Sequence, residues 1–251
     1  MTYQLHYWPG LQGRGEFVRL ALEESGANYV DVVRLPKAQG GGVGALMKAM
    51  ADPDQPFPPF APPFLKDGEV IVFQTANILA YLAPRLGLAP EGEQRRAFAA
   101  GLQLTIADVV AEAHDTHHPI AGGLYYEDQK EAAKARAADF IANRIPGYLG
   151  YFERVLRRNP DGPEHAVGGS LTTIDLSLFQ LVAGLTYAFR RGMAPFTEAC
   201  PRLFRLCRAV EARANIAAYL ASDRRVPFNE TGIFRCYPEL DQDGTWTVEA
   251  T

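Results

Sequence analysis

A tyrosine stands at the end of the first strand-like segment of the chain, and its hydroxyl could take part in chemistry. Residues 3–7 alternate as a strand does, and Tyr7 is the last of them. A tyrosine hydroxyl has a pKa of about 10, so at neutral pH it stays protonated and can donate a hydrogen bond. A strand end that leads into a loop is a common place for catalytic groups. The alternative interpretation is an aromatic side chain that packs in the core.

A threonine opens the helix that is predicted over residues 75–86. The hydroxyl of Thr75 and the first backbone N–H groups of this helix could bind an anion at the positive end of the helix dipole. A plain helix cap would use the same residue type. Both interpretations can hold at once.

Three histidines, His114, His117 and His118, fall near the end of another predicted helix. Their spacing places them on one helical face, so the three imidazoles could converge. That geometry is compatible with zinc, yet histidine is also favoured electrostatically at a helix C-terminus. We therefore expect no metal here, and favour a polar pocket wall or an interface.

The composition is that of an ordinary globular protein. The 251 residues include 47% hydrophobic and 22% charged residues, with a net charge of −4. We therefore expect no nucleic-acid partner and no basic membrane-surface patch. No apolar run is long enough to span a bilayer, and the N-terminus lacks the pattern of a signal peptide. Three widely spaced cysteines argue against a disulfide framework and fit a reducing compartment, so the expected location is cytoplasmic.

The first third of the chain predicts the order strand, helix, strand, long loop, strand, strand, helix. A helix between two strands favours a parallel βαβ unit, and two short apolar runs joined by Asp67-Gly68 predict a β-hairpin. The loop is rich in glycine and proline, and a short helix could form within it. The expected strands are 3–7 and 29–35, and the hairpin is expected over 64–73. The expected helices are 14–25 and 75–86, and the loop covers 36–63, with its short helix over 43–51.

The rest of the chain is predicted to be helical. The expected helices are 94–118, 128–157, 173–190, 199–211 and 213–222. Thr172 and Asp175 form a capping pattern at the start of the third of these. The sequence thus predicts a first domain over 1–86, a linker over 87–93 and an all-helical domain over 94–251, whose tail from residue 226 is expected to be irregular and on the surface.

Four stretches, in this order and spacing, resemble motifs of the cytosolic (soluble) glutathione S-transferase family, and the match spans most of residues 3–222. Leu5-His6-Tyr7-Trp8, together with residues 13–20, is similar to the family's opening strand, catalytic loop and first helix. Residues 62–68 are similar to its cis-proline hairpin, and residues 73–82 to its glutathione-carboxylate motif. Residues 168–175 are similar to the loop and capping box of its helical domain. The resemblance implies the glutathione transferase fold: an α/β thioredoxin-like N-terminal domain that binds glutathione, and an all-α C-terminal domain with the electrophile pocket.

The resemblance makes Tyr7 the expected catalytic residue, whose hydroxyl would stabilise the glutathione thiolate. Family classes that use serine or cysteine place it just after this strand, and residues 8–15 contain neither, which favours the tyrosine type. Trp8 would line the wall for an apolar second substrate, and Arg14 is placed among the substrate-binding residues. The loop is one residue longer than in close tyrosine-type relatives.

The resemblance also assigns residues to the rest of glutathione. Gln74 and Thr75 would bind the γ-glutamyl carboxylate. Pro63 fits the family's cis-proline, and the residue before it normally offers both N–H and C=O to the cysteinyl part. Here that residue is Pro62, which has no N–H, so one of the two hydrogen bonds should be missing. Asp108 matches a family acid that faces the α-amino group, frequently across a dimer interface; an ordinary surface charge is the alternative.

The function that these expectations describe is conjugation of glutathione, as co-substrate, to a small apolar electrophile, with a part in detoxification. A homodimer is implied by the resemblance alone, and no metal or membrane partner is expected. Two alternatives stay open: a binding protein of this fold that catalyses poorly, and a glutathione-dependent isomerase or peroxidase that uses the same thiolate.

Overall fold

The computed structural model describes residues 2–246, which form two compact units. Within the described residues, unit 1 comprises 2–89 with 213–227, and unit 2 comprises 90–212 with 228–246. Met1 and the last five residues of the expected tail, 247–251, lie outside the described part. The segment 213–227 folds with the first unit, although it follows the helices of the second in the sequence.

The sheet of unit 1 has the predicted order of elements. Its strands are β1 (Tyr3–His6), β2 (Tyr29–Asp31), β3 (Phe64–Asp67) and β4 (Val70–Phe73). They lie in the order β2-β1-β3-β4; β1 is parallel to β2, and β3 is antiparallel to both of its neighbours. The predicted strand over 29–35 is too long, because its ladder with β1 stops at the Leu5–Asp31 pair and a 3₁₀ turn, Val32–Arg34, follows.

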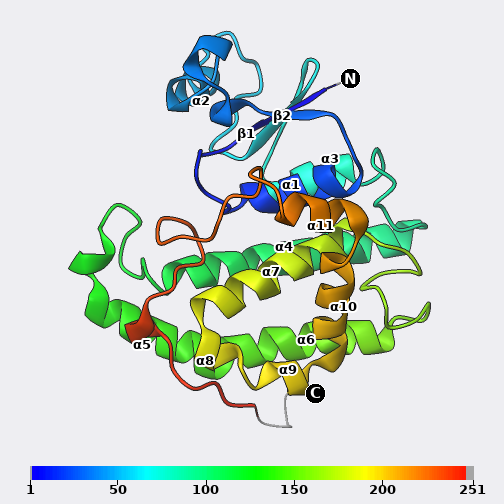
Figure 1. Cartoon of the computed structure of the whole chain (residues 1–251), viewed down its shortest axis with the longest axis vertical. Helices are drawn as coiled ribbons and strands as arrows, with labels where there is room; N and C mark the ends of the chain where they lie inside the picture. The colour runs from blue at the N-terminus through cyan, green and yellow to red at the C-terminus, as the bar shows by residue number, and fades with distance from the viewer. Residues whose placement is uncertain (1, 247–251) are drawn as a thin grey trace. The chain divides into compact units, whose positions relative to one another are not determined.

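Helices cover both faces of this sheet (Figure 1). On one face, α1 (Gly15–Glu24) and α3 (Thr75–Leu82) pack on the strands. Their shared cluster contains Leu5, Val18, Leu22, Leu65, Val72, Ile78 and Leu82. On the other face, α2 (Val43–Met50) packs Leu46 against Val33 and Phe64, which confirms the short helix predicted within the loop. A short 3₁₀ turn, Lys37–Gln39, precedes it.

Unit 2 is helical, and the fold class predicted from the sequence is therefore confirmed. Its helices are α4 (Glu93–Asp115), α5 (Lys130–Asp139), α6 (Ile145–Arg158), α7 (Thr173–Ala188), α8 (Arg190–Met193), α9 (Phe196–Ala199) and α10 (Pro201–Glu211). The predicted capping box begins α7: the Asp175 carboxylate accepts the Thr172 N–H at 2.7 Å, and the Thr172 hydroxyl accepts the Ile174 N–H at 3.3 Å. Across residues 2–246, none of the helices is long and apolar enough to cross a bilayer.

The single helix predicted over 128–157 is interrupted. A 3₁₀ turn, Tyr126–Asp128, leads into α5, and a π-helical stretch, Phe140–Arg144, separates α5 from α6. Pro146 lies in the first turn of α6, and it has no N–H to continue the hydrogen-bond ladder of the preceding turn. A local change to wider helical bonds at this place is how the chain passes the proline.

The last helix, α11 (Ala214–Leu220), packs on α1 in unit 1. Asn215 donates to the Glu24 carbonyl at 2.8 Å, and the Arg213 Nε donates to the Glu24 carboxylate at 2.6 Å. Glu24 lies at the C-terminal end of α1, where the carbonyls have no partner within the helix. These bonds give a physical reason why the segment 213–227 belongs to unit 1.

The tail after residue 227 is irregular, as predicted, but its placement on the surface is wrong. Ile233, Phe234 and Leu240 are buried. The ring of Phe234 lies so close to Gly184 of α7 that a β-carbon there would overlap it. A 3₁₀ turn, Pro238–Leu240, follows. The scattered aromatic residues of this tail therefore serve as packing groups of unit 2.

A histidine in β1 makes the stability of the fold sensitive to acid. His6 is 5% exposed, stacks on Phe64, and neither ring nitrogen has a hydrogen-bond partner among the described residues. Burial, with a smaller effect of Lys66, lowers the pKa of His6 to about 4. In the unfolded chain His6 takes up a proton near pH 6.5, whereas in the folded chain it stays neutral until the pH is near 4. The folded state therefore loses stability as the pH falls from about 6.5 towards 4.

We expect His6→Phe to remove most of this loss, since phenylalanine keeps the stacking and does not titrate. Urea unfolding of wild type should lose about 2–3 kcal/mol between pH 7 and pH 4 through this residue, and the loss should be smaller by that amount in the variant. An equal pH dependence in the two proteins would show that His6 has the same pKa in the folded and the unfolded chain.

Candidate functional site

The register of the sheet brings several of the predicted site residues to one end of it. Phe64 pairs with His6 on one side and with Phe73 on the other, in antiparallel ladders. The residues that come next beyond these pairs are Tyr7 after β1, Pro63 before β3 and Gln74 after β4. Because the strands are antiparallel, all three lie at the same end of the sheet.

Hydrogen bonds join three of the predicted residues directly. The backbone N–H of Arg14 donates to the Tyr7 hydroxyl oxygen at 2.9 Å. The Thr75 hydroxyl donates to the Arg14 carbonyl at 3.4 Å. The backbone of Arg14 thus connects the end of β1 with the start of α3, and its N–H holds the Tyr7 oxygen beside the start of α1.

The Tyr7 hydroxyl remains protonated and can donate. The side chain is 5% exposed, and burial raises its pKa, an effect that the Arg14 N–H and the nearby arginine charges offset only in part. Its oxygen accepts from Arg14, and among the residues that the structure describes no group accepts the hydroxyl's own hydrogen. The site therefore holds a neutral phenol with a donor available to a ligand.

Two glycines make room for the Tyr7 ring. A β-carbon at Gly15 would lie 2.5 Å from the Tyr7 Cδ1, and one at Gly13, which has a φ of +43°, would overlap the hydroxyl. Real β-carbons do not approach so closely, so the ring could not keep its place against a larger residue. The loop and the first turn of α1 therefore fit closely around Tyr7.

Gly15→Ala should displace the Tyr7 ring and reduce any activity that depends on its hydroxyl. We expect at least a tenfold loss of kcat, since small misplacements of catalytic groups are costly, and a destabilisation of about 1–3 kcal/mol. Gly44→Ala in α2 is the matched control, because a β-carbon there meets nothing within 4 Å. A variant at Gly15 with unchanged kcat would contradict the close fit.

The start of α3 differs from the plain cap that the sequence permits. Gln74 occupies the cap position with a φ of +69°, and no side chain caps the helix. The Thr75 hydroxyl is directed to Arg14. The first N–H groups of α3 thus have no side-chain acceptor from the cap residue, which leaves an arrangement suited to a carboxylate.

The proline pair is as predicted. The peptide bond between Pro62 and Pro63 is cis, so Pro63 is the cis residue. Pro63 is buried directly before β3, and Pro62 is half-buried. Since proline has no N–H, Pro62 can offer a ligand its carbonyl only.

Two further predicted residues lie elsewhere. Trp8 is half-buried and packs against the cluster of Val33, Leu46 and Phe64, so it also serves the core of unit 1. Asp108 is exposed on α4, in unit 2. The contacts within the units therefore link Tyr7, Arg14 and Thr75, and give Trp8 a packing role.

A buried network of charges centred on Arg19 lies behind Tyr7. Arg19, fully buried, donates its Nε to Asp31 at 2.8 Å and its Nη1 to Glu16 at 3.2 Å. The same Nη1 donates to the Leu11 carbonyl at 3.2 Å, and the guanidinium lies 5.8 Å from the centre of the Tyr7 ring. Arg19 therefore ties α1 to β2 and to the loop that follows Tyr7.

The segment 213–227 completes this network. The Tyr219 hydroxyl donates to the Glu16 carboxylate at 2.7 Å, and the Arg225 guanidinium also contacts it. Gln12 donates to the Val226 carbonyl at 2.6 Å. The spacing of Glu16 and Arg19 was a usable signal for a local pair, but no sequence pattern joins Glu16 to residues about two hundred positions later.

The three histidines, His114, His117 and His118, do converge at the C-terminal end of α4, in unit 2. Their ring centres lie 4.7–5.1 Å apart. His117 Nε2 donates to the Ile233 carbonyl at 2.8 Å, and its Nδ1 bonds to that of His118. Burial lowers the pKa of His117 to about 3, so it is neutral. Among residues 2–246 no group of His, Cys, Asp or Glu has an arrangement that could hold a metal ion.

Comparison with known proteins agrees with this architecture. A model of the glutathione S-transferase C-terminal domain matches residues 114–223. The chain is 25% identical to glutathione S-transferase P 1 of Xenopus laevis, over 89% of this chain and 93% of that one. It is 27% identical to glutathione S-transferase P of Homo sapiens, over 92% and 98%. The chain is therefore similar to glutathione S-transferases over most of its length.

Solved structures of glutathione S-transferases show the same fold as this chain. The pi-class glutathione S-transferase of Onchocerca volvulus superposes with a TM-score of 0.69 at 20% identity, over 92% of this chain and 99% of that one. The glutathione S-transferase of Ascaris lumbricoides gives a TM-score of 0.63 at 23% identity, over 91% and 100%. The thioredoxin-like unit followed by helices is therefore shared with these proteins.

Proposed function

We propose that this chain is a tyrosine-type glutathione S-transferase in which Tyr7 stabilises the glutathione thiolate. The observation that carries the proposal is the Tyr7 hydroxyl: it is buried and neutral, its oxygen is held by the Arg14 N–H, and its hydrogen is available to a ligand. A family of enzymes that use glutathione supplies the substrate for that donor.

The chemistry follows from the pKa of the thiol. Free glutathione thiol, with a pKa of about 8.5, is only a few per cent ionised at neutral pH, and the thiolate is the nucleophile. A hydrogen bond from Tyr7 favours the charged form and lowers that pKa. The thiol proton leaves to solvent, the sulfur forms a bond to the electrophilic carbon of an apolar substrate, and the leaving group, where there is one, departs with its electron pair.

The remaining groups of glutathione have candidates at the same end of the sheet. The N–H groups at the start of α3, with Gln74 and Thr75, would bind the γ-glutamyl carboxylate. The Pro62 carbonyl would accept the cysteinyl N–H, and the Arg14 guanidinium would attract a glutathione carboxylate. Asp108 would reach an α-amino group in a homodimer, from the other copy.

The proposal assigns glutathione binding to residues 1–86, a linker to 87–93, and the electrophile pocket to the domain expected over 94–251, of which the segment 213–227 folds with unit 1. Trp8 would line the apolar wall from the first of these. A cytoplasmic homodimer with a role in detoxification is part of the same proposal. An electrophile without a leaving group would instead form a bond to the same sulfur, and the resulting anion would take up a proton from solvent.

A weakly catalytic glutathione-binding protein is the second candidate, and one observation favours it. Pro62 lacks the N–H that would otherwise bind the cysteinyl carbonyl, so glutathione loses a strand-like hydrogen bond. Calorimetric titration with glutathione and conjugation of 1-chloro-2,4-dinitrobenzene separate the two. Binding with turnover supports the enzyme, binding without turnover supports the second candidate, and no binding contradicts both.

Pro62→Leu is expected to tighten glutathione binding, because leucine restores an N–H before Pro63. One added hydrogen bond of about 0.5–1.5 kcal/mol corresponds to a Kd lower by about two- to tenfold. Calorimetry measures it, and Pro58→Leu, in the exposed part of the same loop, should leave Kd unchanged. A Kd unchanged or raised in Pro62→Leu, with an intact fold, would place the cysteinyl carbonyl elsewhere.

A further inference from the structure

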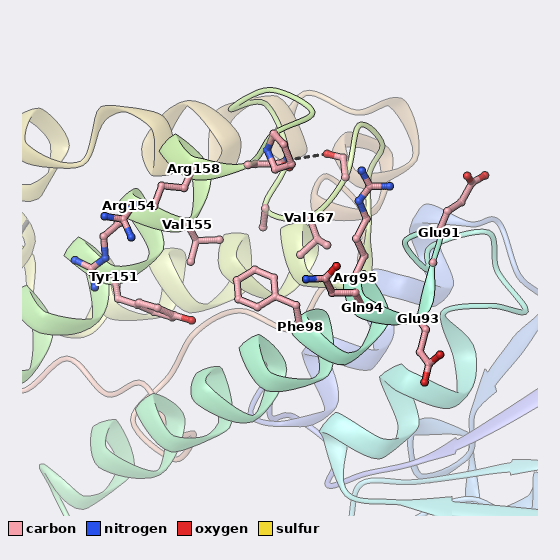
Figure 2. A pocket seen from close by; sticks show the side chains of 15 residues that line it. Glu91, Glu93, Gln94, Arg95, Phe98, Tyr151, Arg154, Val155, Arg158 and Val167 are labelled. Carbon is pink, nitrogen blue, oxygen red and sulfur yellow. Dashed lines mark hydrogen bonds between the residues drawn. The ribbon is translucent and has the colours of Figure 1, made fainter.

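Each of the two units has a cavity of a size that suits a small molecule. In unit 2 a volume of about 590 Å³ lies between the first turns of α4 and the last turns of α6, with Phe98 and Val155 in its wall (Figure 2). In unit 1 a volume of about 580 Å³ lies between the end of α1, the strand β2 and the loop after α11. Small-molecule sites occupy about 300–1,000 Å³. The lining of the unit 1 cavity contains none of the residues proposed to bind glutathione.

The outer edge of β2 forms one wall of the unit 1 cavity. Among the described strands β2 pairs with β1 alone, and all three of its residues line the cavity. The Tyr3 N–H donates to the Asn28 carbonyl at 3.0 Å, and Tyr3 pairs with Tyr29. Since successive residues of a strand direct their backbone groups to opposite sides, the N–H and C=O of Tyr29 point away from β1. This backbone can bond an amide group of a ligand.

Aliphatic side chains form another part of the wall. Leu22 and Ala27 contribute to the cluster shared by α1 and α3, and Val30 and Leu35, which line the same cavity, are half-buried. Half-buried aliphatic groups lose contact with water when a ligand covers them, and this favours binding. An aliphatic side chain of a ligand therefore has a place to pack next to the edge of β2.

Arg34 places a positive charge in the lining. Its Nη1 donates to the Arg224 carbonyl at 2.5 Å, and its Nη2 donates to the Asp223 carbonyl at 3.1 Å. These acceptors are neutral, its ion pair with Asp31 is long at 3.9 Å, and the side chain is 28% exposed. A guanidinium has five N–H donors, so Arg34 retains donors for a ligand.

The two carboxylates of the lining are engaged by other groups. Asp31 Oδ2 accepts from Arg19 Nε at 2.8 Å, and Asp31 Oδ1 is buried. Glu23 accepts from Arg224 Nε and Nη2 at 3.0 and 2.9 Å. It also accepts from the Tyr29 hydroxyl at 2.8 Å. An anion in the cavity therefore meets two carboxylates whose charges are already balanced by arginines, so they repel it little.

We propose that this cavity binds small N-acyl amino acids with an aliphatic side chain. The carboxylate would lie against the Arg34 guanidinium, because charge-assisted hydrogen bonds are stronger than those to neutral acceptors. The amide group would bond the outward backbone of Tyr29, and the side chain would pack on Val30 and Leu35. The site is separate from the proposed thiol chemistry and does not depend on it.

The probe is N-acetyl-L-leucine, titrated into the ¹⁵N-labelled full-length protein with S-methylglutathione in excess and followed by amide NMR. Saturable shifts are expected at the amides of residues 26–35, with a Kd of about 1 mM or below. N-acetyl-L-leucinamide has the same amide and side chain without the negative charge. It should bind at least about fivefold more weakly, since the contact with Arg34 is lost.

Variants of the lining test the same assignment. Arg34→Gln should raise Kd for N-acetyl-L-leucine by about five- to tenfold, since it removes the charge, and Leu35→Ala should raise it by about threefold. Lys48→Gln is the matched control, because Lys48 is an exposed cation of α2 in the same unit and lies outside the lining. Its Kd should stay within about twofold of wild type. The amide spectrum of each variant without probe establishes that the fold is kept.

Four results would overturn the proposal. One is the absence of saturable shifts up to about 20 mM probe. Another is an equal effect of Arg34→Gln and Lys48→Gln, which would show only a general response to surface charge. Shifts confined to the α4 and α6 residues of the unit 2 cavity would place the probe there instead. Loss of the shifts when S-methylglutathione is added would place the probe at the glutathione site.

Discussion

Tyr7→Phe is expected to lower kcat for conjugation by about 100-fold while Kd for glutathione changes by less than about threefold. Removing one positioned donor from a developing anion typically costs two to three orders of magnitude in rate. The phenyl ring keeps the packing against Gly13 and Gly15, so the loop should stay in place. Steady-state kinetics with 1-chloro-2,4-dinitrobenzene and calorimetry with glutathione measure the two quantities.

Tyr3→Phe is the matched control for this experiment. Tyr3 lies at the start of β1, the strand that leads to Tyr7; it is half-buried, and its substitution also removes a single hydroxyl oxygen. Its kinetics should equal those of wild type. If Tyr7→Phe turned over as fast as wild type, the proposed role of the hydroxyl would be wrong, whatever the glutathione affinity.

Arg19→Met is expected to lower the free energy of unfolding by about 3–5 kcal/mol. Methionine fills much of the same space, but it leaves Asp31 and Glu16 buried without the cation between them, and loss of one partner of a buried ion pair has costs of this size. The Leu11 carbonyl also loses its donor. Urea unfolding followed by tryptophan fluorescence measures the change.

Arg34→Met separates burial from charge in this test. Arg34 approaches the same Asp31 carboxylate at 3.9 Å, but its side chain is 28% exposed. A pair of this kind contributes at most about 1 kcal/mol, so the control should lose much less. Equal losses in the two variants would mean that the buried network is not what stabilises α1 and the loop after Tyr7.

The sequence predicts the parts of the fold that depend on local pattern. The Asp67-Gly68 turn and the short apolar runs around it indicate the β3–β4 hairpin, and Thr172 with Asp175 indicates the start of α7. The family's hairpin motif locates the cis bond at Pro63. In each case the deciding residues are close neighbours in the chain, so the pattern contains the physical cause.

Features that depend on distant contacts were not predictable in this way. Glu16 binds Tyr219 and Arg225, and Gln12 binds the Val226 carbonyl, across more than two hundred residues. No periodicity encodes such pairs. The length of β2 depends on how many residues pair with β1, and the burial of Phe234 depends on Gly184, a glycine of α7.

The most direct test of the account is the pKa of the glutathione thiol in the complex, titrated through the ultraviolet absorbance of the thiolate. If Tyr7 donates to the sulfur, this pKa should fall from about 8.5 in free glutathione to about 7 or below on wild type, and return towards 8.5 on Tyr7→Phe. A thiol pKa that is the same on both proteins would contradict the central claim.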